Sequence, residues 1–166
     1  NPSGITASGG ASPIVVPGLV NGTAYTFTVR AANSAGTGGP SAASNSATPA
    51  TAPGSPTAVG ATSGDAQATI SFTPPVSNGG SAITGFTATS NPSGITASGA
   101  GSPIAYPAGS LVNGIAYTFT VTATNGGALP GAVPLTGAPS APSNSVTPAP
   151  AVTVPGAPTA VSAPAV

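Results

Sequence analysis

The chain has 166 residues, of which one is Lys or Arg and one is Asp or Glu, with no His, Cys or Trp. Binding nucleic acid takes several Lys or Arg to neutralise phosphates, and zinc or dedicated calcium sites take Cys, His or several carboxylates, so the composition excludes nucleic-acid partners, metal sites and cofactors that depend on such groups. No apolar run approaches the ~20 residues that a transmembrane helix needs, so no membrane span is expected.

The first recognisable element is a repeat. The block NPSGITASG at residues 1–9 recurs letter for letter at residues 91–99. A period of about 90 residues has the size of a small domain, so we expect separate domains and not the turns of a solenoid. The offset between the copies grows along the chain, and each step marks an insertion into a loop. These loops fall at residues 107–110, 126–138 and 149–154.

The complete unit, residues 53–148, is predicted to hold seven short strands, bounded by Gly, Pro and Asn. They are expected at residues 55–61, 66–73, 82–89, 95–98, 103–106, 115–124 and 141–146. Alternation is clearest in 115–124, where Tyr117, Phe119, Val121 and Ala123 face inward. Ile83 and Phe86 are three residues apart, so an irregularity is expected at Gly85. Seven strands without helical periodicity predict a β-sandwich.

Four segments carry a resemblance to a known family. They are LVNGIAYTFTVTATN at residues 111–125, PGSP at 53–56 with ITGF at 83–86, and SNSVTP at 143–148, and together they resemble bacterial fibronectin type III repeats. The resemblance implies an all-β fold of immunoglobulin-like (fibronectin type III) β-sandwiches in tandem. It also places Tyr25 and Tyr117 at the tyrosine corner, where a buried ring ties its hydroxyl to the backbone upstream. Phe72 stands where many members carry Trp.

On this mapping the chain has three parts. Residues 1–49 are the C-terminal half of a repeat, residues 53–148 are a complete repeat, and residues 155–166 are the first strand of a further repeat. Neither end part can bury a core alone, so the favoured interpretation is a piece of a longer array. The alternative is strand exchange, in which residues of the last part complete the sandwich of another molecule; these are Pro158, Ala160 and Val161.

The chain lacks the side chains on which catalysis usually depends, so it is predicted not to be an enzyme. General acid-base chemistry needs His or a placed carboxylate, and the only candidate, Asp65, follows Gly64 as a turn residue would. The many Ser and Thr have no base to activate them. Arg30 is expected on a solvated strand face.

The remaining candidates for function are surfaces. The insertion ALPGAVPLTG carries three apolar side chains and no charge, and it either folds over the sandwich or contacts a partner; these side chains are Leu129, Val133 and Leu135. The outward threonines of 115–124 are explained by β-propensity, with a glycan-binding ladder as the alternative. A net charge near zero also favours association, because it removes mutual repulsion.

The sequence therefore predicts a non-catalytic structural or adhesive module of an extracellular, cell-surface bacterial protein. Self-assembly into a fibre or layer, as a homo-oligomer or through neighbouring repeats, is the favoured form. The alternative is a spacer or carbohydrate-contacting module of a secreted polysaccharide-degrading enzyme, with polysaccharide as the partner. Tyr106 is the only tyrosine outside the corner positions that could stack on a sugar ring. A phage or virion surface module is a third reading.

Overall fold

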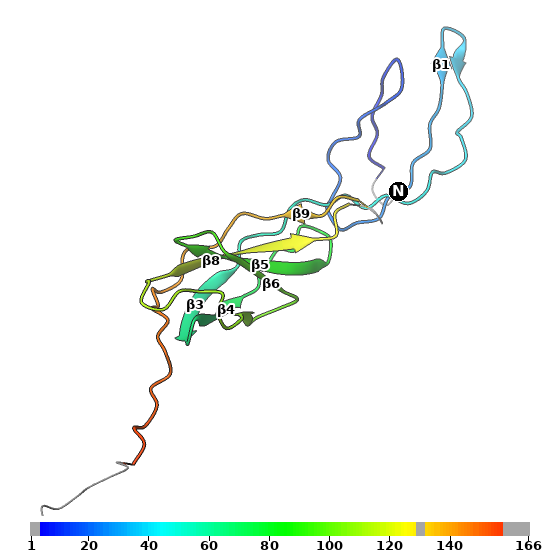
Figure 1. Ribbon diagram of the computed structural model, residues 1–166. Helices are drawn as coiled ribbons and strands as arrows, with labels where there is room; N and C mark the ends of the chain where they lie inside the picture. The colour runs from blue at the N-terminus through cyan, green and yellow to red at the C-terminus, as the bar shows by residue number, and fades with distance from the viewer. Residues whose placement is uncertain (1–3, 129–131, 158–166) are drawn as a thin grey trace, which may run out of the picture.

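The computed structural model describes residues 4–128 and 132–157, and strands β3 to β9 form one sandwich within residues 53–148. Residues 4–50, hereafter the N-terminal segment, lie at one end of this sandwich as two long hairpin-like arms (Figure 1). Residues 149–157, orange to red, leave from the opposite end (Figure 1). The described part of the chain contains no helix that is long and apolar enough to cross a membrane.

Two antiparallel sheets form the layers of the sandwich. The first has the order β3-β4-β7 and the second the order β6-β5-β8-β9. The first sheet consists of β3 (Thr57–Gly64), β4 (Gln67–Thr73) and β7 (Ile104–Tyr106). The second consists of β5 (Ile83–Asn91), β6 (Thr96–Gly99), β8 (Thr118–Asn125) and β9 (Leu135–Thr136). In the N-terminal segment, β1 (Ala32–Asn33) and β2 (Gly36–Thr37) pair at the tip of one arm (Figure 1).

The core lies between the two sheets and follows the period of two that the sequence shows. Side chains of β4 and β8 alternate between buried and more exposed positions along the whole strand. The inward positions predicted for the central strand are confirmed, because these side chains are at most 1% exposed; they are Tyr117, Phe119, Val121 and Ala123. The rings of Phe72 and Phe86 close the core between the sheets, with centroids 4.9 Å apart.

Six of the seven strands expected in residues 53–148 are present, each within a few residues of its predicted limits. The irregularity expected at Gly85 is also confirmed, since the register of β5 against β8 shifts between Ile83 and Gly85. The prediction of a regular last strand at residues 141–146 is wrong. Its only strand-type pairing is a single bridge between Tyr117 and Val146.

Two serines replace the ladder in this last segment. The amides of Ser140 and Ser143 donate to the carbonyls of Val121 and Phe119 at 2.9 and 2.8 Å. Their hydroxyls accept from the amides of the same two residues at 2.9 and 3.0 Å. Each hydroxyl also donates to the next carbonyl of its own segment. Because each serine serves two backbone groups, the segment advances three residues per contact and loses the alternation of a strand.

The N-terminal segment repeats this arrangement bond for bond. Ser41 and Ser44 donate their amides to the carbonyls of Val29 and Phe27, and their hydroxyls accept from the amides of those residues at 3.1 and 3.0 Å. Here, however, both serines are exposed, whereas Ser140 and Ser143 are buried. The same hydrogen-bond geometry therefore occurs with buried serines in the sandwich and with exposed serines in the N-terminal segment.

We expect Ser143→Ala to lower the free energy of unfolding of the sandwich by about 1–3 kcal/mol, because it leaves a buried amide without an acceptor. The matched change, Ser44→Ala, should cost less than about 0.5 kcal/mol, because water replaces the lost bond there. Urea unfolding followed by circular dichroism measures both. Equal losses for the two variants would show that burial does not set the strength of this bond.

Candidate functional site

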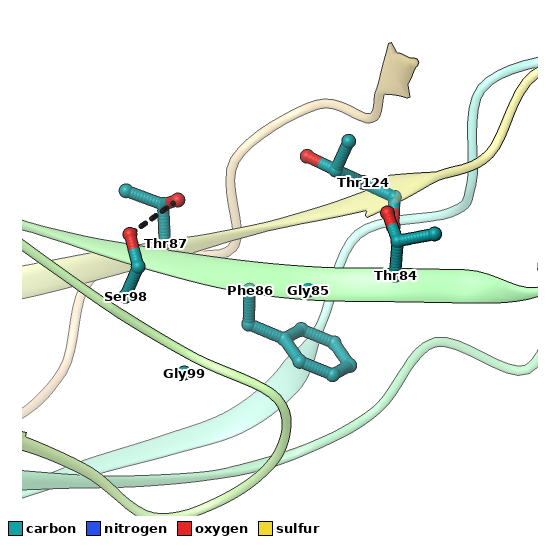
Figure 2. A pocket seen from close by; sticks show the side chains of 7 residues that line it. All are labelled: Thr84, Gly85, Phe86, Thr87, Ser98, Gly99 and Thr124. Atoms are coloured by element: carbon teal, nitrogen blue, oxygen red, sulfur yellow. Dashed lines mark hydrogen bonds between the residues drawn. The ribbon is translucent and has the colours of Figure 1, made fainter. Parts of the chain in front are cut away.

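The outer face of the second sheet carries a shallow hollow of about 430 Å³. Figure 2 shows that hydroxyl groups of β5, β6 and β8 line it, and that the ring of Phe86 points to the opposite side of β5. The hydroxyls of Thr87 and Ser98 bond each other at 3.1 Å (Figure 2). With no charged residue in its lining, this surface can offer neutral hydrogen bonds but no proton transfer.

A second candidate site is the joint between the N-terminal segment and the sandwich. Its centre is Asn125, the last residue of β8, whose side chain is fully buried. The Nδ2 group donates to the carbonyls of Thr51 and Asn78, both at 2.8 Å, and Oδ1 accepts from the Gly127 amide at 3.1 Å. One side chain thereby connects three parts of the chain. They are the stretch around Thr51 that joins the N-terminal segment to the sandwich, hereafter the linker, the turn at residues 78–80, and the end of β8.

The linker and the turn also bond each other directly. The Thr51 amide donates to the Gly79 carbonyl at 2.8 Å, and the Gly54 amide donates to the Ser77 carbonyl at 2.9 Å. Gly79 has φ +74°, and a Cβ there would collide with the carbonyl oxygen of Thr51. Only glycine allows the backbone of this turn to approach the linker so closely.

The N-terminal segment contacts the same place through the turn at Asn21 and Gly22. Asn21 donates from Nδ2 to the Thr51 hydroxyl at 3.3 Å, and the Gly22 amide donates to the Pro49 carbonyl at 2.9 Å. A Cβ on Gly80, which has φ +88°, would meet the backbone of Gly22. The linker is therefore held from both sides by neutral hydrogen bonds, and a groove of about 440 Å³ lined by small uncharged residues runs between the two parts.

The three tyrosines are all buried and all have hydrogen-bond partners. The hydroxyls of Tyr25 and Tyr117 accept from the amides of Val20 and Val112 at 3.0 and 3.2 Å, five residues upstream in each case. Tyr106 is 1% exposed, and its hydroxyl donates to the carbonyls of Ala88 and Ile95 at 2.8 and 3.0 Å. Burial raises the pKa of Tyr106 from 10.0 to about 12. Its ring is not available to stack on a sugar.

The structure separates the residues predicted to contact a partner. Val133 is 81% exposed, and Leu135 is partly buried in β9 at the edge of the second sheet. Leu129 lies outside the described residues, as do the residues named for strand exchange, which are Pro158, Ala160 and Val161. The structure therefore brings no partner-contact cluster together from these positions.

Asp65 lies in a turn, as predicted, and Arg30 is exposed as predicted but does not belong to a strand. Asp65 is in the turn between β3 and β4, where its Oδ1 accepts from Nδ2 of Asn113 at 2.8 Å. Arg30 is exposed and donates to the Gly38 carbonyl at 3.4 Å. Both make local contacts with neutral groups.

Sequence reasoning missed Asn125 as the centre of the joint. A signal was available, because an Asn ends the alternating run in both copies, at Asn33 and Asn125. A polar residue that closes an apolar strand on its inward side needs a partner for each of its groups. The sequence does not show that those partners come from the linker and from a turn about 50 residues away.

Comparisons with known proteins show the fold. No protein-family model and no curated protein matches the chain. Among solved structures it is similar to a crystal structure of titin domains, with a TM-score of 0.50 and 22% identity over 59% of this chain and 32% of that one. It is also similar to the FN1–FN3 domains of chicken CNTN1, with a TM-score of 0.51 and 23% identity over 84% of this chain and 48% of that one. The chain thus spans a third to a half of these structures, and its fold is an all-β, fibronectin type III or immunoglobulin-like sandwich.

We expect Asn125→Ala to free the linker and to destabilise the sandwich by about 1–3 kcal/mol, because two part-buried hydrogen bonds, to the carbonyls of Thr51 and Asn78, are lost. The exchange of the Thr51 amide, measured by NMR, should speed up together with the fall in the urea midpoint. Asn33→Ala is the matched control, since Asn33 occupies the corresponding position but is exposed. If the Thr51 amide exchanges as slowly in Asn125→Ala as in the native chain, Asn125 does not hold the linker.

The raised pKa of Tyr106 predicts a loss of stability at high pH. The unfolded chain releases this phenolic proton near pH 10 and the folded chain near pH 12, so the contribution is complete below pH 10 and is lost between pH 10 and 12. The expected loss is about 2–3 kcal/mol. Urea unfolding from pH 8 to 12 should show this fall in the native chain and a smaller one in Tyr106→Phe. Parallel curves for the two proteins would contradict it.

Proposed function

We propose that the chain is a non-catalytic structural module of an extracellular, cell-surface bacterial protein, in which consecutive β-sandwiches assemble into a fibre or layer. In this proposal residues 1–49 and 155–166 belong to neighbouring repeats, and residues 53–148 form one complete repeat. The observation that carries it is the joint at Asn125, where the buried side-chain amide donates to the linker at Thr51 and is itself fixed by bonds to Asn78 and Gly127. A linker fixed in this way transmits orientation from one module to the next.

Composition supports the same function. The chain has one cation and one anion in 166 residues, so modules experience almost no electrostatic repulsion when they meet. Neutral surfaces of this kind associate readily, and assembly uses that property. Residues 132–136 offer a contact for it, because Val133 projects from the loop before β9 and Leu135 lies at the sheet edge.

The second candidate function is a spacer or carbohydrate-contacting module of a secreted polysaccharide-degrading enzyme. The observation that favours it is the hydroxyl-lined hollow over β5, β6 and β8, whose neutral donors and acceptors suit a sugar (Figure 2). Against it, sugar sites ordinarily place an aromatic ring under the sugar, and the three tyrosines are all buried. The structural function therefore has the stronger support.

We expect Val133→Lys to weaken assembly of the chain without lowering its stability, because it places a desolvation-sensitive charge on an exposed apolar contact. Val76→Lys is the matched control, since Val76 is also exposed but lies between β4 and β5. Negative-stain imaging and sedimentation measure assembly, and urea unfolding measures stability.

Assembly should also change little between about 0.05 and 0.5 M NaCl, because almost no charges are present to be screened. A chain that stays monomeric at all concentrations, with polysaccharide binding that depends on Thr87 and Ser98, would replace the structural function with the second one. Equal effects of the two lysine variants would show that Val133 is not the contact.

A further inference from the structure

The N-terminal segment holds the local conformation of the sandwich but leaves its apolar face open. Its ring pair, Tyr25 and Phe27, has centroids 6.4 Å apart, compared with 6.3 Å for Tyr117 and Phe119. The Tyr hydroxyl contact and the serine bonds are also the same in both. Burial differs, because Val29 is 59% exposed whereas the corresponding Val121 is 0% exposed. Ile14 and Ile104 differ in the same way, at 38% and 2%.

The sandwich shows what covers such a face. β5 pairs along the edge of β8, with Ala88 opposite Val121, and β4 contributes apolar side chains to the same core. These covering side chains all come from residues 53–90, and the largest are Ile70, Phe72 and Phe86. No described residue of the N-terminal segment plays this part for Val29 or Phe27.

Three amide side chains point to the same missing partner. In the sandwich, Asn113 accepts from the Ala66 amide, Asn125 donates to the Asn78 carbonyl, and Asn144 brackets Ala61 by accepting from its amide at 2.8 Å and donating to its carbonyl at 3.0 Å. Every one of these partners again lies within residues 53–90. The corresponding residues of the N-terminal segment are all exposed; they are Asn21, Asn33 and Asn45. Asn21 donates to the Thr51 hydroxyl instead, and Asn33 accepts from the nearby Ala35 amide.

We propose that the open face of the N-terminal segment is a docking surface for a three-stranded β segment with the pattern of residues 53–90. Such a segment would present alternating apolar side chains to Val29 and Phe27, an extended backbone to Asn45 and a turn carbonyl to Asn33. The inference goes beyond the proposed function, because it concerns how one sandwich is completed and holds whether or not the modules form a fibre.

The exact recurrence of NPSGITASG makes a direct test feasible. Fusing a second copy of residues 53–90 before Asn1 reproduces the junction that the chain has at residues 90 and 91, because residue 90 is followed by the same block. The chain contains no cysteine, so Val29→Cys supplies a single thiol as the probe. Thiol labelling by a disulfide reagent is then measured in the unfused and the fused chain. Val121→Cys and Val76→Cys provide the buried and the exposed reference.

We expect the fused segment to slow labelling of Val29→Cys by about 100-fold or more, toward the rate of Val121→Cys, because reaction then requires the face to open. Carrying Ile70→Asp and Phe72→Asp in the added copy alone should restore fast labelling, while the native sandwich stays intact. Labelling that remains as fast as that of Val76→Cys in the fused chain would overturn the proposal.

The same labelling measurement also tests whether a second copy of the chain covers the open face. Slow labelling of the unfused chain that depends on protein concentration would mean that a second copy covers the face, and this would also overturn the proposal. Labelling does not report on fibres, so its failure is distinct from a failure of the proposed function, which imaging tests.

Discussion

A chain with one cation and one anion must pair its buried backbone through neutral side chains, because charge-assisted bonds are available only near Arg30 and Asp65. Ser, Asn and Tyr take this part at several places where the backbone leaves the regular sheets. Ser140 and Ser143 hold the last segment, Asn125 holds the linker, and each tyrosine hydroxyl contacts a main-chain group. Among the described residues, no buried side-chain nitrogen or oxygen lacks a partner. The architecture of the sandwich edges rests on these bonds.

Such bonds depend on burial for their strength. A neutral hydrogen bond contributes little where water competes, while an unpaired group costs about 1–3 kcal/mol where water is absent. The two copies make this visible, since Ser44 and Ser143 make equivalent bonds on an exposed and a buried backbone. Stability is therefore concentrated in the sandwich, and the N-terminal segment has its shape without the burial that would make that shape rigid.

The sequence predicts the parts of the fold that follow from alternation. β4 and β8 have strict period-two patterns, and the three-residue spacing of Ile83 and Phe86 locates the shift at Gly85. It fails at residues 141–146, because a serine that bonds two backbone groups looks like an ordinary strand residue in a letter pattern. It also fails to find the joint, because Asn125 meets its partners only through long-range folding. Patterns within a short stretch of sequence predict the structure of that stretch, but they do not predict contacts between loops that are distant in the sequence.

The linkers show how the joint tolerates variation. Three residues separate Pro49 from Pro53, and six separate Pro148 from Pro155, but a Thr stands two residues before the second proline in both. The three extra residues of the second linker therefore come before Thr153, which corresponds to Thr51. The spacing between this Thr and the following proline is the same in both linkers. The upstream side differs, because Asn113 is bound to Asp65 and Ala66, whereas Asn21 reaches the linker. The longer linker is instead bound to the preceding sandwich at its first residue, where the Ala149 amide donates to the Gly64 carbonyl at 3.3 Å. The two linkers therefore differ in how the sequence before them holds them.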